Sequence, residues 1–211
     1  MLALLSQSPI LFLLLVAALL IAITVHEFMH AWTANYLGDP TAKYMGRISL
    51  NPIHHLDPIG TIAIFLIGIG WGKPVQINER NFKNPRMGSA IVSIVGPLSN
   101  LFVAFIFSIP VLLHTIPTDS YVYLLFFLIV RINILLMILN LIPIPPLDGS
   151  KVLYFFLPRN VDIVKLETYG PMILLALIAF SFFDPNGGLF ALIFRVSQPI
   201  LNLLGFSSVP F

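Results

Sequence analysis

The stretch PILFLLLVAALLIAITVHEFMH, residues 9–30, decides how this chain folds. Its part from Pro9 to Val25 carries no charge, as expected of a membrane-spanning helix, which needs about 20 apolar residues. The run ends in HEFMH, residues 26–30, an H-E-x-x-H pattern. Two histidines and a glutamate are costly to insert into lipid, so their presence at this point indicates a functional site.

The spacing of the pattern indicates the chemistry of that site. On a helix, residues four apart differ by about 40° in direction and by roughly 6 Å in height. The imidazoles of His26 and His30 therefore face one metal ion. Glu27 lies beside them, where its carboxylate can take a proton from a water molecule at the metal.

The composition excludes several classes of protein. The chain has 211 residues, of which 58% are hydrophobic and only 9% charged, whereas an ordinary soluble domain is about 25% charged. We therefore expect an integral membrane protein in a lipid bilayer. A net charge of +2 without a basic run excludes nucleic acid as a partner. The absence of cysteine excludes disulfides, thiolate metal ligands and a cysteine nucleophile.

The apolar runs predict an all-α polytopic membrane protein with about five to six transmembrane or re-entrant helices. We expect spans at 9–37, 87–113, 121–142 and 169–183. The run 58–70 is short enough to be re-entrant or interfacial, and 189–205, which contains Arg195, Gln198 and Pro199, either spans or lies at the interface. A further helix should run from near Asp148 to Leu157. The first run is interpreted as a retained span, because no basic residue precedes it and no small-residue cleavage site follows.

One segment shows a different period. Residues 75–78, Val-Gln-Ile-Asn, alternate apolar and polar side chains, which predicts a short strand and hence a β-hairpin-like cytoplasmic element. Its exposed edge near the site is a candidate for holding a substrate by strand addition.

Basic residues set the expected topology. Six of the eleven Lys and Arg residues lie between the first two spans, and none lies in the loop 114–120. Lys151, Arg159 and Lys165 follow the third span. The positive-inside rule places 38–86 and 143–168 in the cytoplasm and the N-terminus outside. The HEFMH end of the first span and the Asp148 end of the third then approach the same, cytoplasmic side.

A catalytic zinc usually has three protein ligands and one open position, and HEFMH supplies two. The candidates for the third are Asp39, His54, His55, Asp57 and Asp148. We favour Asp148, because it follows the Pro-rich break NLIPIPPLDG at 140–149. Irregular backbone at membrane depth is tolerated where it is buried or lines a wet cavity, and a carboxylate there needs a charge partner. Asp148 as a plain helix N-cap is the competing interpretation.

Beyond these residues, the sequence resembles the site-2 protease family of intramembrane zinc metalloproteases. HEFMH is followed about 110 residues later by NLIPIPPLDG, which resembles the family's Asn-Leu-x-Pro-x-Pro-Pro-Leu-Asp-Gly segment. The likeness covers about residues 15–157. The other shared segments are NPIHHLDPIGT at 51–61, GWGKPV at 70–75 and GPLSN at 96–100.

The resemblance implies a fold, an activity and a set of residues. It implies a core of three transmembrane helices holding one Zn²⁺ per chain through His26, His30 and Asp148, with Glu27 as general base. It also implies that the Asn140 amide holds the substrate carbonyl and stabilises the oxyanion; a bond to a neighbouring helix is the alternative. The substrate would be a transmembrane segment of another protein.

The resemblance also bears on organisation and location. It suggests one domain over 1–211, with its core at about 9–157 and C-terminal helices at about 168–205. Such a chain looks like a compact member, without the PDZ or CBS modules of some relatives. Its compact build and lack of targeting signals fit a prokaryotic plasma membrane, and the positive-inside rule places the active site toward the cytoplasm.

Some residues and functions stay open at this stage. His54 and His55 are expected in a cytoplasmic loop, bonded to a carbonyl or to Asp57. Gly96 and Asn100 permit close helix packing, or Asn100 faces the cleft, and the mid-span Arg131 has no place in the family pattern. Two rival functions are a catalytically inactive metal-binding adaptor and a metal-ion transporter, whose polar ligands would be spread over both membrane halves.

Overall fold

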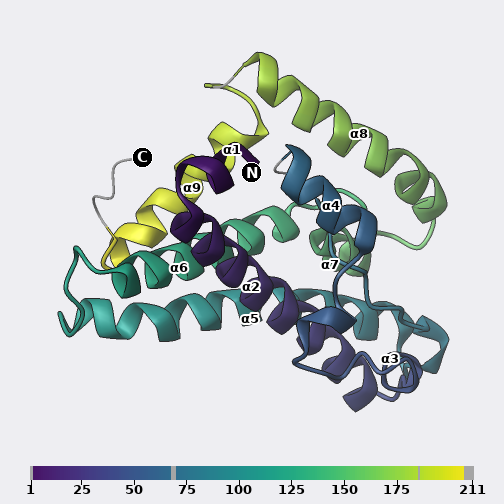
Figure 1. Cartoon of the computed structure of the whole chain (residues 1–211). Helices are drawn as coiled ribbons and strands as arrows, with labels where there is room; N and C mark the ends of the chain where they lie inside the picture. The colour runs from purple at the N-terminus through teal and green to yellow at the C-terminus, as the bar shows by residue number, and fades with distance from the viewer. Residues whose placement is uncertain (1, 68–69, 185, 207–211) are drawn as a thin grey trace.

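A computed structural model of the chain describes residues 2–67, 70–184 and 186–206, which form a bundle of helices (Figure 1). Four helices are long and apolar enough to cross a membrane: α2 (Pro9–Tyr36), α5 (Pro85–Leu112), α6 (Tyr121–Leu141) and α8 (Ile163–Phe183). The shorter elements are α1 (Leu2–Gln7), α3 (Thr41–Tyr44), η1 (Pro52–His54), α4 (Pro58–Ile67), η2 (Glu79–Asn81), α7 (Asp148–Phe156) and α9 (Leu189–Leu203).

These elements confirm the expectation of an all-α polytopic membrane protein. The first three spans begin and end within two residues of the expected bounds. The fourth begins six residues earlier than expected, at Ile163, because the Asp162 side chain accepts a hydrogen bond from the Lys165 N–H and caps the helix before its apolar part starts. At 15 residues, α9 rises only about 22 Å, less than the roughly 30 Å of a bilayer core.

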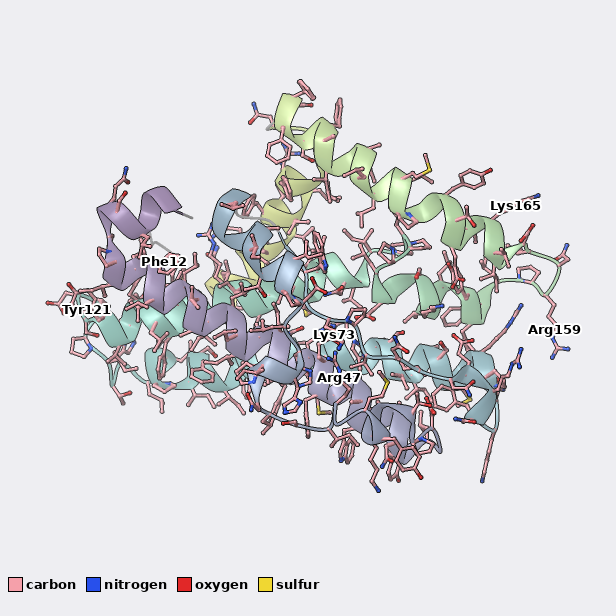
Figure 2. The ribbon with its side chains drawn as sticks, turned by 45° about the vertical axis from the view of Figure 1, so that its right-hand side comes forward. Phe12, Arg47, Lys73, Tyr121, Arg159 and Lys165 are labelled. Atoms are coloured by element: carbon pink, nitrogen blue, oxygen red, sulfur yellow. The ribbon has the colours of Figure 1, made fainter. Side chains whose placement is uncertain are left out.

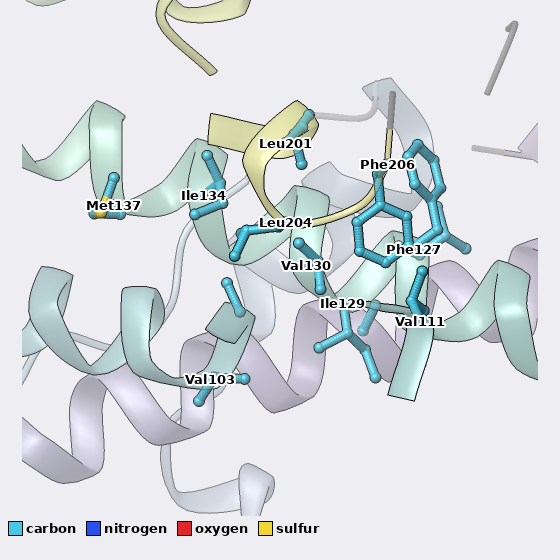
Figure 3. Close-up of a cluster of buried hydrophobic side chains, with 13 residues drawn as sticks. Val103, Val111, Phe127, Ile129, Val130, Ile134, Met137, Leu201, Leu204 and Phe206 are labelled. Carbon is cyan, nitrogen blue, oxygen red and sulfur yellow. The ribbon is translucent and has the colours of Figure 1, made fainter. Parts of the chain in front are cut away.

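The core is formed where α2, α5 and α6 pack against one another, with α9 on the outer side of α6 (Figure 1). Figure 3 shows the apolar cluster that joins them, which includes Val103 of α5, Ile134 of α6 and Leu201 of α9. By contrast, α8 buries only Gly170 and Ser181 among its described residues. Its remaining apolar surface suits contact with lipid.

The mid-span charge of Arg131 lies at the junction of α6 and α9. Its guanidinium carbon is 5.7 Å from the ring centroids of Phe127 and of Phe194, which lie on these two helices. Cation–π contacts of this kind stabilise a cation that has been removed from water. The charged end of Arg131 therefore lies against aromatic rings of the protein.

The predicted β-hairpin-like element is wrong in its pairing. In the described part of the chain there is no strand, and only an isolated antiparallel bridge joins Leu56 to Gly72. The segment 73–78 has no regular structure. The Lys73 N–H donates to the His55 carbonyl oxygen beside the bridge, but two later backbone donors are taken up by side chains. The Val75 N–H donates to Glu27 Oε2 at 3.1 Å, and the Asn78 N–H donates to Asp39 Oδ2 at 2.7 Å.

Candidate metal centre

Two helices bring three potential ligand atoms together. His26 and His30, both buried on α2, have their Nε2 atoms 2.9 Å apart. The Oδ2 atom of Asp148, from α7, lies 3.1 Å from the first of these nitrogens and 3.2 Å from the second. Among the described residues this trio is a group of side chains that can hold a metal ion. The prediction that the two chain segments meet is therefore confirmed.

The Pro-rich break explains how Asp148 reaches the histidines. The segment 143–147 ends α6, and α7 begins at Asp148 itself. The N-cap position belongs to Leu147, so the interpretation of Asp148 as a plain N-cap is wrong. The next residue, Gly149, lies so close to the end of α6 that a Cβ there would be 2.3 Å from the Leu141 carbonyl oxygen. Only glycine permits this close return of the chain.

The tautomer of His30 follows from its neighbour on α5. His30 Nδ1 lies 2.8 Å from the Val92 carbonyl oxygen, which can only accept a hydrogen bond. Nδ1 therefore carries the proton, and Nε2 presents its lone pair to the other histidine.

His26 is held in the same tautomer by an asparagine. Its Nδ1 lies 2.7 Å from Asn100 Oδ1, and the amide nitrogen of Asn100 donates to the Ala22 carbonyl oxygen at 3.1 Å. The Asn100 oxygen is thus the acceptor that faces His26, and His26 Nδ1 is the donor.

Two lone pairs and a carboxylate oxygen consequently converge on one point. At separations of 2.9–3.2 Å these electron-rich atoms repel one another unless a proton or a metal ion lies between them. Two imidazole nitrogens and one carboxylate oxygen are a ligand set that zinc prefers, and zinc bonds of about 2.0–2.1 Å arranged tetrahedrally place ligand atoms roughly 3.3 Å apart. The residues present therefore fit a zinc ion that keeps an open fourth position.

Glu27 is held beside this trio by the irregular segment 73–78. Its Oε2 accepts the Val75 N–H, as described above. Arg47, which is buried, fastens the same segment, since its guanidinium donates to the carbonyl oxygens of His54 and Lys73. Burial lowers the pKa of Arg47 and the charge of Glu27 raises it, so the two groups are electrostatically coupled. Figure 2 shows Arg47 and Lys73 next to each other.

The remaining proposed catalytic residue, Asn140, lies in the last turn of α6 and is partly buried. Its amide nitrogen donates to the Leu136 carbonyl oxygen at 3.1 Å, one turn earlier in the same helix. Each amide nitrogen has two N–H groups, so this bond leaves one donor. Within the described residues no hydrogen bond joins Asn140 to the metal trio.

The other candidate ligands have structural roles elsewhere. Asp39 accepts hydrogen bonds from Thr41, Asn78 and Asn81 and so fastens the loop that follows α2. Asp57 caps the start of α4 by accepting the Gly60 N–H at 2.8 Å.

The two neighbouring histidines differ from each other. His54 is exposed, whereas His55 is buried and its Nε2 lies 2.6 Å from the Ser49 carbonyl oxygen, to which it donates. Burial, with a smaller effect of the nearby Arg47 charge, lowers the pKa of His55, so the ring is neutral at pH 7. The expectation that either histidine bonds a carbonyl holds for His55.

Comparison with known proteins agrees with this geometry. The chain is 41% identical over 197 residues to a Bacillus subtilis (strain 168) protein named "Putative zinc metalloprotease YwhC", a match that covers 89% of this chain and 85% of the relative. The chain belongs to this family of zinc metalloproteases.

Two further relatives are mycobacterial proteins named "Putative zinc metalloprotease Rip2". The protein of Mycolicibacterium smegmatis is 31% identical over 150 residues, which cover 65% of this chain and 55% of the relative. The protein of Mycobacterium tuberculosis (strain H37Rv) is 28% identical over 148 residues, which cover 67% of this chain and 56% of the relative. The chain thus matches little more than half the length of these two relatives. No family model and no solved structure matches the chain.

Proposed function

We propose that this chain is an intramembrane zinc metalloprotease of the site-2 protease type, which hydrolyses peptide bonds in or near the transmembrane segments of other membrane proteins. The observation that carries the proposal is the convergence of the lone pairs of His26 and His30 on the Asp148 carboxylate inside a bundle of apolar helices, with Glu27 beside them. The zinc metalloprotease family of the chain supports the same conclusion.

In this proposal His26, His30 and Asp148 hold one zinc ion per chain, and Glu27 is the general base. Zinc supplies Lewis acidity, which polarises the scissile carbonyl and lowers the pKa of water to about 7. Glu27 takes the proton of the attacking water and delivers it to the leaving amine. The Val75 N–H holds the Glu27 carboxylate in place for both transfers. Asn140 turns its remaining N–H toward the carbonyl oxygen, where negative charge develops.

The substrate must unwind before it can be cut, because a helix protects its amides by internal hydrogen bonds. The irregular segment 73–78 runs beside the base, and the Val75 N–H marks the point of contact. We assign to this segment the binding of the unwound substrate in an extended form, by backbone hydrogen bonds. Arg47 keeps the segment in place through the Lys73 carbonyl.

The site is proposed to open to the cytoplasm of a bacterial cell, in an activity that serves regulated intramembrane proteolysis. Figure 2 shows Arg159 and Lys165 at the end of the molecule opposite Tyr121, in keeping with the sequence-based topology. Asp148 begins α7, which follows the C-terminal end of α6 and leads toward Arg159. The trio therefore lies toward the end of α6 from which the chain continues to the basic residues Arg159 and Lys165.

The test is cleavage of a tagged single-span substrate by the purified chain in liposomes, with the zinc content measured in parallel. Glu27→Gln preserves the shape of the side chain but cannot accept a proton. It should retain zinc and lose turnover by about 10²–10⁴-fold. Asn140→Ala keeps the base and removes the oxyanion donor, so a loss of about 10²–10³-fold is expected.

Three outcomes separate this function from its rivals. A wild type that binds zinc but cleaves no substrate would indicate an inactive adaptor. Zinc flux into the liposomes that does not depend on Glu27 would indicate a transporter. Cleavage by Glu27→Gln at the wild-type rate, with zinc bound, would remove Glu27 as the base and refute the proposal.

A further inference from the structure

Two asparagines are completely buried in the core of the bundle, Asn100 on α5 and Asn133 on α6. A buried amide destabilises a protein unless its donors and acceptor are hydrogen-bonded. Both amides satisfy this requirement in a continuous chain of hydrogen bonds that crosses all three core helices and ends on His26.

The direction of each bond in this chain follows from one backbone carbonyl. The Ile129 oxygen can only accept, so Asn133 turns its amide nitrogen toward it, at 2.8 Å. The Asn133 oxygen then accepts from the amide nitrogen of Asn100, also at 2.8 Å. The Asn100 oxygen is left to face His26 Nδ1 at 2.7 Å, and that nitrogen must be the donor.

The two histidines differ in how firmly their tautomer is set. His30 donates to the Val92 carbonyl, whose polarity cannot be reversed. His26 instead donates to an amide, which would serve equally well as a donor if it turned over. Two acceptors prevent that rotation, the Ala22 carbonyl on α2 and the Asn133 oxygen on α6.

We propose that Asn100 and Asn133 are positioning residues for the metal centre, which fix His26 as the Nδ1–H tautomer with its Nε2 lone pair turned toward Asp148 and His30. The inference rests on the proposed function in so far as zinc is the ion bound. Groups that orient a metal ligand in this way typically change metal affinity by about 10–100-fold when they are removed.

A purely structural role is the competing explanation, since polar residues often join helices within membranes. The two roles differ in what the atom facing His26 must be. For positioning it must be an acceptor, whereas for helix association any well-packed contact suffices. Substitutions of Asn100 separate the roles: Asn100→Leu removes the acceptor, while Asn100→Asp keeps an acceptor oxygen at His26 and loses both donors.

The experiment measures the zinc dissociation constant of the full chain in detergent, by competition with a chromophoric chelator. We expect the constant to rise about 10–100-fold in Asn100→Leu, to stay within a few-fold of wild type in Asn100→Asp, and to rise about 10-fold in Asn133→Leu. Ser108→Ala is the control, because Ser108 is also fully buried on α5 but donates only to the Phe105 carbonyl. It should leave the constant unchanged.

Thermal unfolding of the metal-free proteins is measured alongside. Both Asn100 variants leave the Ala22 and Asn133 oxygens without a donor, so both should unfold at lower temperature than wild type. Stability and zinc affinity would then separate in Asn100→Asp. Zinc binding by Asn100→Leu at wild-type affinity, or equal weakening in Asn100→Asp and Asn100→Leu, would overturn the proposal and leave helix association as the role.

A second measurement does not depend on any variant folding. Nitrogen-15 NMR of labelled histidine in the metal-free wild type, at a pH where His26 is neutral, distinguishes the two tautomers. The proposal requires the proton of His26 on Nδ1, and its presence on Nε2 would refute it. If the wild type bound no zinc but showed the Nδ1–H tautomer, the proposed function would fail while the hydrogen-bond chain stood.

Discussion

Gly96 lies where α5 passes against the rings of His26 and His30, and substitution by alanine there tests the geometry of the site. A Cβ at position 96 would lie 2.4 Å from both Cε1 and Nε2 of His30 and 2.8 Å from Cε1 of His26. Comfortable contacts between such atoms are about 3.5–4.0 Å. The added methyl group must therefore displace a ring, or the helix, by roughly 1 Å.

Neither histidine can move that far and still bind a metal ion. Nδ1 of each ring is tied to α5, one to the Val92 carbonyl and one to Asn100. Metal–ligand distances tolerate deviations of only about 0.2 Å. Removing a group that merely orients a ligand costs about 10–100-fold in affinity, so displacing the ligand itself should weaken zinc binding at least about 100-fold.

Gly88→Ala is a matched control on the same helix. Gly88 is also buried, and a Cβ there would lie 2.5 Å from the ring of Phe82. The two glycines are eight residues, about 12 Å, apart along α5, and alanine favours a helix interior over glycine by about 0.5–1 kcal/mol at either position. Gly88→Ala should change stability and leave the zinc dissociation constant within a few-fold of wild type.

The assay for both variants is zinc competition with a chelator, with circular dichroism to confirm helix content and cleavage of a single-span substrate to report activity. Gly96→Ala should be helical, low in zinc and inactive. Wild-type zinc affinity in a folded Gly96→Ala protein would refute the conclusion that His26 and His30 form the metal site in this arrangement.

The remaining predictions concern the ligands, the topology and the loop that follows α2. Purified protein should hold about one zinc ion per chain, measured by atomic absorption. His26→Ala and His30→Ala should lose most of this zinc, and Asp148→Ala should bind it more weakly. Full zinc retention in Asp148→Ala would point to another third ligand. A cysteine in place of Arg80 should react with an impermeant maleimide only from the cytoplasmic side and one in place of Thr118 only from outside, and the reverse labelling would invert the topology. Although burial raises the pKa of Asp39, hydrogen bonds from Thr41, Asn81 and the Asn78 N–H outweigh it and lower that pKa below its ordinary 3.8. The stability that ionised Asp39 contributes is therefore present above about pH 4 and lost as the pH falls through the lower folded-state pKa. The Asp39→Asn protein should be less stable than wild type at neutral pH, its stability should depend less on pH below about 4, and it should keep its zinc. Identical acid-unfolding curves of the variant and the wild type in circular dichroism would contradict this.

Local sequence patterns were sufficient to predict much of the metal site. An uncharged run of helical length followed by H-E-x-x-H places two imidazoles on one helix face, because that spacing is a property of the helix itself. The Pro-rich break before Asp148 can likewise be recognised in the sequence, because proline lacks a backbone N–H and its ring clashes with the preceding helical turn. These two features sufficed to predict the trio His26, His30 and Asp148 that the structure brings together.

The groups around the trio became visible only in the tertiary structure. Asn133 has no neighbour in sequence that signals its role, and it acts through Asn100, 33 residues away. Nothing in the sequence distinguishes Arg47 from the other basic residues between the first two spans, or Val92 from the other residues of the second span. Yet Arg47 fastens the segment beside Glu27, and Val92 sets the tautomer of His30.

The strand predicted at 75–78 was wrong because the sequence does not show which acceptors lie near its backbone. Alternation of side chains indicates an extended backbone, but pairing depends on which acceptors lie opposite the N–H groups. Here the acceptors are the carboxylates of Glu27, in the second half of α2, and of Asp39, in the loop after that helix. The sequence by itself thus determined the long apolar helices and the residues that we propose as metal ligands and as the base. Packing alone determined which donors and acceptors hold them, because those contacts join residues that are far apart in the chain.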